Sequence, residues 1–335
     1  MRVFINGFGR IGRSVLRAWA LDIVGRVPRH WADVQIVGIN DIAAAEMCAY
    51  LFEFDSVFGP WGGSVSLHEG ALVVNGTAIP LTQAPDLSAL DLSGVDLVME
   101  CTGRADTRAV AMRGIEGGAR RVLVSGPSAA AQYTVVLGAN EAGLDAALRT
   151  GAKVLSNASC TTNALAPLVR LLDQEFGIKT GWMTTIHCYT GSQPTTDAPS
   201  VDYARSRAAA LSMVPTTTSA QRLLDVVLPH LAGKIEGAAV RVPVASVSVV
   251  DLTVMLEKDC DVAAVNALFA GQKTVIGSTD RALVSSDLRA RPESIVMALP
   301  ETRKTAGGML RAFGWYDNEW GFSNRMLDVA RLLRD

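Results

Sequence analysis

The chain opens on the stretch VFINGFGRIG, residues 3–12, which places glycines at positions 7, 9 and 12. An apolar run precedes these glycines, and residues 14–20, SVLRAWA, continue with the apolar spacing of an amphipathic helix. A strand, a glycine-rich turn and a helix in this order form the context that a dinucleotide-binding fingerprint requires. The stretch therefore predicts a Rossmann-type doubly wound sheet at the N-terminus.

Each position of this fingerprint has an expected role toward a dinucleotide. Gly7 permits a tight turn, Gly9 lets the pyrophosphate approach the backbone, and Gly12 allows close packing of the helix on the strand. The backbone N–H groups of Arg10 and Ile11 would meet the phosphates at the start of the helix.

Asp41 follows the second apolar run, residues 34–39, and is expected at the end of a strand. Its carboxylate would accept hydrogen bonds from a ribose 2′-hydroxyl and repel a 2′-phosphate, so the sequence predicts NAD rather than NADP. Asp41 lies further from Gly12 than the roughly 20 residues of the fingerprint, which indicates an insertion around residues 22–30. Ser125, at the end of a further expected strand, is assigned to the same site.

Two different strand patterns divide the rest of the chain. Up to residue 158, apolar runs at 97–100 and 121–125 alternate with helical segments, as in a parallel doubly wound sheet. Beyond it, longer alternating or β-branched runs at 181–187 and 245–254 predict a mixed or antiparallel sheet. The expected fold is α/β, a Rossmann-type doubly wound parallel sheet followed by an α+β domain.

Composition narrows the class of protein. The 335 residues suffice for two domains, each with its own core, and 19% charged against 49% hydrophobic residues is an ordinary globular balance. A net charge of −2 argues against nucleic-acid binding, and no apolar run approaches the roughly 18 residues of a membrane span. The five scattered cysteines indicate free thiols in a reducing cytoplasm, and four histidines without i, i+4 spacing argue against a metal site.

Cys160 lies in the stretch SNASCTTN, residues 156–163, between an apolar run and a helical segment at 164–172. This order predicts a strand, a tight turn and a helix, with the thiol at the helix N-terminus. There the unpaired N–H groups and the helix dipole favour a nucleophilic thiolate and would hold an oxyanion. A free cysteine is more often a buried structural residue, so position alone does not decide its role.

His187 is the candidate base for this thiol. It ends the strand-like run at 181–187, and a Cys–His pair both activates the thiol and moves a proton. A lone histidine among apolar neighbours is by itself more often a packed core residue. The adjacent Cys188 is expected to be a bystander, because its side chain points to the other face if the strand continues.

Seven blocks of the sequence resemble phosphorylating glyceraldehyde-3-phosphate dehydrogenases, and together they span essentially the whole chain. They are residues 5–13, 39–41, 156–163, 184–187, 241–243, 248–253 and 315–319. The resemblance implies that the Cys160 thiolate attacks an aldehyde to give a thiohemiacetal, with His187 as general base. Hydride transfer to the nicotinamide would leave an acyl-thioester, which inorganic phosphate would cleave. The resemblance also implies that Asn318 binds the carboxamide of the nicotinamide.

The same resemblance implies two phosphate pockets, one for a phosphorylated aldose and one for inorganic phosphate. Thr190 and Arg241 would hold the substrate phosphate. Hydroxyl and guanidinium groups are strong phosphate donors, and such groups would surround the attacking phosphate at Ser159, Thr161, Arg207, Thr218 and Ser219. Ser219 departs from the glycine usual at its position, and the role of the nearby Arg205 stays open.

Two other functions stay open. Residues 319–322 and 324–328 resemble the related erythrose-4-phosphate dehydrogenases, whereas Thr190 and the run 216–218 favour the triose phosphate. A non-catalytic NAD-binding interaction protein on the same scaffold would have lost chemical residues, yet Cys160 is retained with its candidate base. Arsenate resembles phosphate in size and charge, so these motifs do not separate the two acceptors.

The resemblance further implies a homotetramer, with the loop at 189–207 packed against a neighbouring subunit. The C-terminal segment would return to the first domain. This assigns residues 1–158 and 319–335 to an NAD-binding domain and residues 159–318 to a catalytic domain.

Overall fold

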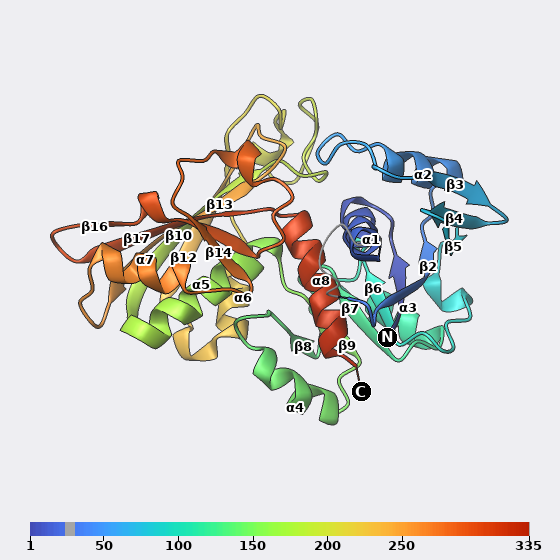
Figure 1. The fold of residues 1–335 in the computed structure, drawn as a ribbon, viewed down its shortest axis with the longest axis horizontal. Helices are drawn as coiled ribbons and strands as arrows, with labels where there is room; N and C mark the ends of the chain where they lie inside the picture. The colour runs from blue at the N-terminus through green and yellow to red at the C-terminus, as the bar shows by residue number, and fades with distance from the viewer. Residues whose placement is uncertain (24–30, 335) are drawn as a thin grey trace. The chain divides into compact units, whose positions relative to one another are not determined.

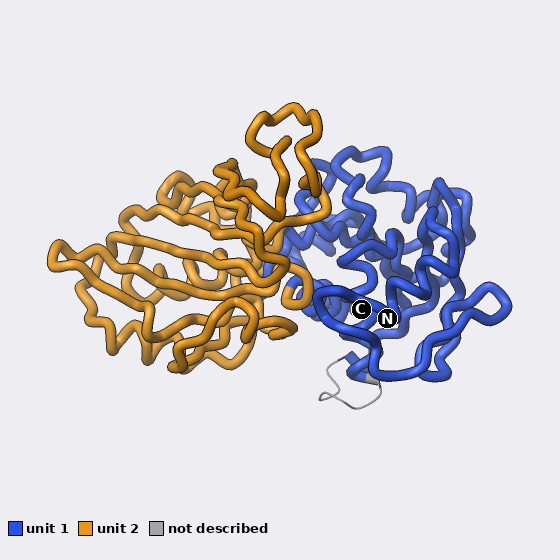
Figure 2. The backbone as a smooth tube through the Cα atoms, turned by 90° about the horizontal axis from the view of Figure 1, so that it is seen from above, with its two compact units in different colours: residues 1–137, 141–158, 322–335 blue, residues 138–140, 159–321 orange. Residues whose placement is uncertain are grey.

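The protein is described by a computed structural model that covers residues 1–23 and 31–334, so residues 24–30 of the expected insertion lie outside the described residues. The chain forms two compact units. The first comprises residues 1–137, 141–158 and 322–335, and the second comprises residues 138–140 and 159–321 (Figure 2). Each unit is built around its own sheet.

The first unit contains a nine-stranded sheet in the order β3-β4-β5-β2-β1-β6-β7-β9-β8 (Figure 1). The strands are β1 (Arg2–Asn6), β2 (Gln35–Asn40), β3 (Val65–His68), β4 (Ala71–Val74), β5 (Thr77–Thr82), β6 (Leu97–Glu100), β7 (Arg121–Val124), β8 (Tyr133–Thr134) and β9 (Val154–Ser156). From β5 to β8 every neighbouring pair is parallel. The run β5-β2-β1-β6-β7-β9 is the doubly wound strand order with β1 near its centre. This confirms the predicted Rossmann-type sheet.

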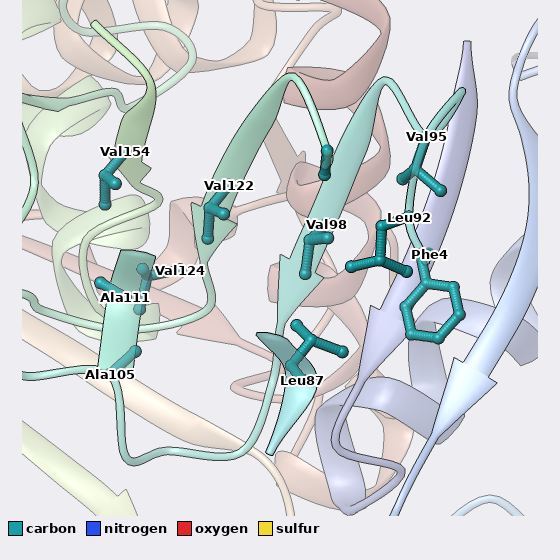
Figure 3. Packing of buried hydrophobic residues seen from close by; sticks show 11 residues of the cluster. Phe4, Leu87, Leu92, Val95, Val98, Ala105, Ala111, Val122, Val124 and Val154 are labelled. Carbon is teal, nitrogen blue, oxygen red and sulfur yellow. The ribbon is translucent and has the colours of Figure 1, made fainter. Parts of the chain in front are cut away.

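One hydrophobic cluster shows how a helix packs on this sheet. The helices of the unit are α1 (Arg10–Ile23), α2 (Ala45–Glu53), α3 (Arg108–Glu116) and α4 (Leu144–Arg149). Val98, Val122 and Val154 of three neighbouring strands lie in one buried cluster with Ala111 of α3 (Figure 3). A Cβ added at Gly114 of α3 would lie 2.9 Å from a methyl group of Val122. Glycine therefore allows α3 to approach the sheet closely.

The C-terminal helix α8 (Trp320–Leu332) belongs to this first unit from residue 322 onward. Its Asp328 carboxylate accepts a hydrogen bond from the Trp31 indole at 2.9 Å. Arg121 of β7 donates to the carbonyl of Leu333 at 3.2 Å. These contacts tie the end of the chain to the sheet that begins at its N-terminus.

The second unit contains an eight-stranded mixed sheet, as the sequence predicted. Seven strands follow the order β11-β12-β10-β13-β17-β15-β14, and β16 pairs with β17. They are β10 (Ile178–Cys188), β11 (Val214–Thr216), β12 (Ile235–Val242), β13 (Ser248–Leu256), β14 (Ile276–Thr279), β15 (Ile295–Ala298), β16 (Arg303–Lys304) and β17 (Met309–Tyr316). The helices are α5 (Cys160–Phe176), α6 (Ala220–Val227) and α7 (Val262–Ala270).

Helix α5 contacts the central strands β10, β13 and β17 of this sheet and is buried along most of its length. Its first turn is therefore held at a fixed position relative to the ends of β10 and β17. No helix among the described residues combines the length and the apolar character that crossing a bilayer would need.

Candidate active site

The glycines of the turn after β1 are present for two different reasons. At Gly7, φ is +90°, and an added Cβ would lie 2.6 Å from the backbone nitrogen of Thr102. At Gly12, an added Cβ would lie 2.1 Å from the carbonyl oxygen of Gly7. Both are therefore required by the packing of the chain itself.

Gly9 is different, because an added Cβ there would meet no atom of the protein within 4 Å. The backbone at Gly9 is open on this side, immediately before the first residue of α1. A pyrophosphate that presses against this backbone and against the helix start fits that open space. The described residues thus fit a dinucleotide at the predicted position.

Asp41 is brought to the same turn from the end of β2. Its carboxylate accepts hydrogen bonds from the N–H of Phe8 at 2.6 Å and of Ala43 at 2.9 Å. The N–H of Ser125, which follows β7, donates to the carbonyl of Glu100 at 2.9 Å. Both residues lie at the carboxyl edge of the parallel sheet, where ligands of doubly wound folds bind.

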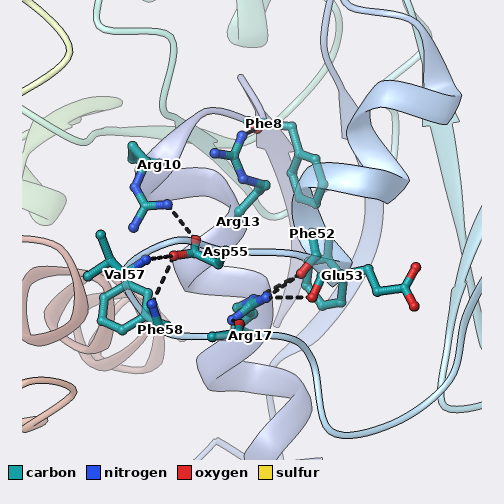
Figure 4. Close-up of polar contacts among 10 residues, drawn as sticks. Phe8, Arg10, Arg13, Arg17, Phe52, Glu53, Asp55, Val57 and Phe58 are labelled. Carbon is teal, nitrogen blue, oxygen red and sulfur yellow. Dashed lines mark hydrogen bonds and ion pairs between the residues drawn. The ribbon is translucent and has the colours of Figure 1, made fainter.

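Arg10 uses its side chain structurally, which the sequence did not predict. It pairs with Asp55, whose carboxylate also accepts the N–H groups of Val57 at 2.8 Å and Phe58 at 2.9 Å (Figure 4). Burial pushes the pKa of Asp55 up, but these hydrogen bonds and the Arg10 charge outweigh it and leave the pKa below its ordinary value. Arg17 extends this contact by donating to the carbonyl of Phe52. The start of α1 is thereby fixed to the segment after α2.

Cys160 is the first residue of α5, in the strand, turn and helix that the sequence predicted. Ser159 caps the helix, because its Oγ accepts the N–H of Thr162 at 3.0 Å. The preceding Ala158 is fully buried with φ of +56°, a left-handed conformation that is rare outside glycine. This strained residue turns the chain sharply between β9 and α5.

The pKa of the Cys160 thiol is raised by burial, the largest effect on it. The charge of Arg241, the Thr161 hydroxyl and the N–H groups of residues 160 and 161 all act to lower it, but they do not outweigh burial. The N–H groups at the helix start thus lower the pKa in the direction that the sequence predicted, but burial has the larger effect. The thiol needs a base beside it.

His187 supplies that base at the end of β10. Its Nε2 lies 3.6 Å from Cys160 Sγ, and its side chain is buried. Burial, and then the charge of Arg241, lower the pKa of His187 to about 4. The imidazole is consequently neutral near pH 7, where it can accept a proton from the thiol.

Arg241 lies beside His187 because the two residues are register partners on the parallel strands β12 and β10. Its Nη1 is 2.9 Å from His187 Nδ1 and donates to the carbonyl of Cys188 at 3.1 Å. His187 Nδ1 is itself 2.7 Å from that carbonyl. Arg241 can only donate, so its contact is a hydrogen bond when Nδ1 carries no proton. In the other tautomer the proton on Nδ1 bonds the carbonyl, and Nε2 is the acceptor that faces the sulfur.

Tyr316 is a residue of this site that sequence reasoning missed, although it lies in the block 315–319. Its buried hydroxyl is 2.8 Å from the hydroxyl of Thr161 and 2.8 Å from that of Thr185. Its ring meets His187 edge-on, with centroids 5.9 Å apart. Tyr316 thus orients both the turn that carries the thiol and the base.

Asn318 follows β17 and is 7% exposed. Its Oδ1 accepts a hydrogen bond from the thiol of Cys188 at 3.0 Å. The carboxylate of Asp317 accepts the N–H groups of Ala290 at 2.8 Å and Trp320 at 2.8 Å. The backbone on which Asn318 stands is therefore held firmly.

The residues predicted for phosphate binding differ in their surroundings. Thr190 Oγ1 is 3.0 Å from Ser192 Oγ. Arg207 is exposed and donates to Asp197 at 2.8 Å. Arg205, in contrast, donates to Thr216 Oγ1 at 2.7 Å. Of the two arginines, Arg205 has the contact with the segment that leads to Thr218.

Thr218 and Ser219 form the turn into α6. The Thr218 hydroxyl accepts the N–H of Ala220 at 3.1 Å, and Ser219 precedes the helix with φ of −75°. Glycine is therefore not required by the backbone at position 219. Among the described residues, no group of three or more His, Cys, Asp or Glu side chains is placed to hold a metal ion.

Comparisons with known proteins agree with this arrangement. Residues 1–108 match the family model "Glyceraldehyde 3-phosphate dehydrogenase, NAD binding domain", and residues 159–318 match the C-terminal domain of the same family. The glyceraldehyde-3-phosphate dehydrogenase of Cereibacter sphaeroides is 45% identical, covering 98% of this chain and 97% of its own length. The enzyme of Xanthobacter flavus is 43% identical, again covering 98% and 97%. Glyceraldehyde-3-phosphate dehydrogenase 1 of Bacillus cereus is 42% identical with the same coverage.

The chain belongs to the glyceraldehyde-3-phosphate dehydrogenase family. This confirms the resemblance read from the seven blocks, and with it the prediction of an oxidoreductase whose cofactor is NAD. Ala164 lies one turn along α5 from Cys160 and is fully buried. This glyceraldehyde-3-phosphate dehydrogenase relative thus carries a single thiol on that face of the helix.

Proposed function

We propose that this chain catalyses the NAD-dependent oxidative phosphorylation of D-glyceraldehyde 3-phosphate to 1,3-bisphosphoglycerate. The observation that carries the proposal is the pair of Cys160 Sγ and His187 Nε2 at 3.6 Å, with Arg241 directly beside the imidazole. A thiol, a neutral base and a fixed cation are the groups that a phosphorylated aldehyde requires.

The reaction begins with proton transfer from the Cys160 thiol to His187 Nε2 as the sulfur attacks the aldehyde carbon. The N–H groups at the start of α5 stabilise the negative oxygen that develops. His187 returns this proton to the oxygen, which gives the thiohemiacetal hydroxyl. His187 would then accept the proton again as the carbon loses a hydride and becomes an acyl-thioester on Cys160. Phosphate oxygen attacks this carbonyl and the C–S bond breaks, which forms an acyl phosphate; the departing thiolate takes the proton from His187 and becomes the thiol again.

NAD, when bound, supplies the acceptor for the hydride that leaves the thiohemiacetal carbon. The turn from Gly7 to Gly12, with Asp41 and Ser125, would hold its dinucleotide part. Asn318 would hold the carboxamide of the nicotinamide. A fixed carboxamide fixes which face of the ring receives the hydride.

Arg241 would change partners during this sequence. In the free chain its guanidinium lies 2.9 Å from His187 Nδ1 and helps to keep the imidazole neutral. A substrate phosphate bound to Arg241 and Thr190 would neutralise that charge and make His187 a stronger base. Binding of the correct substrate would thereby improve proton removal.

The second phosphate pocket is proposed to contain Ser159, Thr161, Thr218 and Ser219 with one arginine. Arg207 remains a candidate from the sequence. The hydrogen bond from Arg205 to Thr216 supports Arg205 as the nearer donor. Both arginines therefore enter the test below.

We also propose that the first unit is the NAD-binding domain, the second is the catalytic domain, and the enzyme is a cytoplasmic homotetramer. Within the loop at 189–207, Val201 and Tyr203 expose almost their entire side chains. Large exposed apolar side chains of this kind are typical of a surface that a second subunit covers.

Initial rates with the triose and the tetrose phosphate, each with and without inorganic phosphate, test the proposed function. We expect NADH formation from D-glyceraldehyde 3-phosphate that depends on phosphate and stops in Cys160→Ser. Phosphate-independent oxidation of erythrose 4-phosphate would instead assign the chain to the related dehydrogenase. NAD binding without turnover of either sugar would identify a non-catalytic scaffold.

A further inference from the structure

Cys188 is a buried thiol that the proposed reaction does not use. It is the last residue of β10, its side chain is fully buried, and it forms no disulfide. Burial is the main reason that the pKa of this thiol is raised to about 12. The group therefore stays protonated near pH 7 and acts as a hydrogen-bond donor rather than as a nucleophile.

The Cys188 thiol donates to Asn318 Oδ1 at a sulfur–oxygen distance of 3.0 Å. The backbone N–H of Cys188 donates to Ser248 Oγ at 3.1 Å, which fixes the end of β10 against β13. The thiol thus approaches Asn318 from a rigid sheet. The sequence-based expectation that Cys188 is a bystander did not include this contact.

A side-chain amide has one oxygen that accepts and one nitrogen that donates, so a partner at the oxygen decides which way the nitrogen points. With Oδ1 held by Cys188, Asn318 Nδ2 is directed to the opposite side. Among the described residues, no hydrogen bond from Nδ2 to another protein group is found. Its two N–H bonds are available to a ligand.

We propose that Cys188 is a positioning residue, which sets the amide orientation of Asn318 so that Nδ2 faces the carboxamide oxygen of NAD. This inference rests on the proposed contact between Asn318 and the nicotinamide. Asp317 fixes the backbone at this point, and Cys188 fixes the remaining rotation of the side chain. A reversed amide would present an oxygen to the carboxamide oxygen and repel it.

Calorimetric titration with NAD and with ADP-ribose, which lacks the nicotinamide, tests the proposal without turnover. Cys188→Ala should weaken NAD binding about fivefold, the value of one ordinary hydrogen bond, and leave ADP-ribose binding unchanged. Cys188→Ser keeps a donor and should restore NAD binding to within about twofold. Cys260→Ala, at a cysteine remote in sequence from both residues, is the matched control.

A double-mutant cycle separates positioning from general loosening of the fold. In Asn318→Ala, adding Cys188→Ala should cause no further loss of NAD affinity, because the residue through which Cys188 acts is gone. Cys188→Val fills the space of the thiol without a donor, and it replaces Cys188→Ala if that variant does not fold. Transfer of deuterium to both faces of the nicotinamide should also rise in Cys188→Val.

Equal weakening of NAD and ADP-ribose, or a Cys188→Ser variant as weak as Cys188→Ala, would overturn the proposal. These binding results do not depend on turnover. A wild-type chain that binds NAD but fails to oxidise D-glyceraldehyde 3-phosphate would contradict the proposed function alone.

Discussion

The surroundings of the Cys160 thiol and of the His187 imidazole shift their pKa values so that both groups are neutral near pH 7. Burial holds the pKa of the thiol above its ordinary value and lowers that of the imidazole to about 4, so both groups are neutral at rest. Proton transfer between atoms 3.6 Å apart then creates the nucleophile. The reactivity belongs to the pair rather than to the helix start.

Alkylation by iodoacetamide should reveal this pair. Cys160 is partly exposed beside a base, whereas Cys188 is fully buried, so Cys160 should react first. His187→Asn should slow its modification at pH 7 by about tenfold or more. Mass spectrometry of timed samples measures both rates. Labelling of Cys160 no faster than that of Cys260 would argue against activation by His187.

The two arginines near the second phosphate pocket give a paired prediction. Arg205→Ala should raise the KM for inorganic phosphate about tenfold or more, because a charged donor is lost. Arg207→Ala should raise it by less than about threefold, because an exposed ion pair such as that with Asp197 contributes little. Initial rates at varied phosphate concentration decide between them. A larger rise in KM for Arg207→Ala than for Arg205→Ala would indicate that Arg207 is the arginine of the pocket.

The nucleophile and its base were predictable from the chemistry of their residue types, whereas Asn318 was proposed only through the resemblance to the family. The roles of Tyr316 and Cys188 were not predictable. Their partners Thr161 and Asn318 lie 155 and 130 positions away in the chain. The packing of α5 on the sheet and the order of strands β10, β13 and β17 bring such pairs together, and neither is readable from a single motif.

At the scale of elements, the turn between β1 and α1 contains glycines that are needed for two different reasons. Gly7 and Gly12 are fixed by internal packing, and Gly9 lies on open space. Within these six residues, substitutions at Gly7 and Gly12 should therefore affect stability, and a substitution at Gly9 should affect ligand binding.

Gly9→Ala and Gly12→Ala should behave oppositely. Gly12→Ala places a Cβ 2.1 Å from a backbone oxygen, so it should lower the free energy of unfolding by about 2–3 kcal/mol. Gly9→Ala should change that free energy by less than about 0.5 kcal/mol but weaken NAD binding. Urea denaturation and calorimetric titration measure the two effects. A Gly9→Ala variant that binds NAD normally would contradict a pyrophosphate at this backbone.

Both sheets were predictable in type, because alternating strands and helices differ from long β-branched runs in their periodicity. Strand order within the second sheet was not, since β10 pairs with β12 and β13, which lie on the far side of a long loop. The contact of Arg10 with Asp55 was also hidden, because a basic side chain in a fingerprint carries no local sign of its partner.

For the whole molecule, stability should fall in acid because of His187. Its pKa is about 4 in the folded chain, against an ordinary 6.5, so between these values the unfolded chain binds more protons. The contribution of neutral His187 to the free energy of unfolding is complete above pH 6.5. It is lost as the pH falls toward 4, and its size is on the order of 3 kcal/mol. His187→Asn should flatten this part of the pH dependence in urea denaturation. An unchanged slope would show that other groups cause it.

Assembly should also depend on the exposed loop at 189–207. Sedimentation equilibrium should give four times the 35.5 kDa of one chain. Tyr203→Glu places a charge on this surface and should yield smaller species at the same concentration. Val284→Glu, at another exposed apolar residue outside the loop, is the control and should leave the mass unchanged. A monomeric wild-type chain would exclude the tetramer.

The pairing of β10 with β12 would limit the length of a substrate that spans His187 and Arg241. His187 and Arg241 are opposite each other on these strands, whose spacing of about 4.8 Å is fixed by the hydrogen bonds of the sheet. If the aldehyde reacts beside His187 while the phosphate is bound by Arg241, the paired strands fix the backbone positions from which both side chains reach the substrate, and Thr190 reaches the same phosphate from the loop at 189–207. A sugar longer by one carbon, about 1.5 Å, would have to fold or shift to fit.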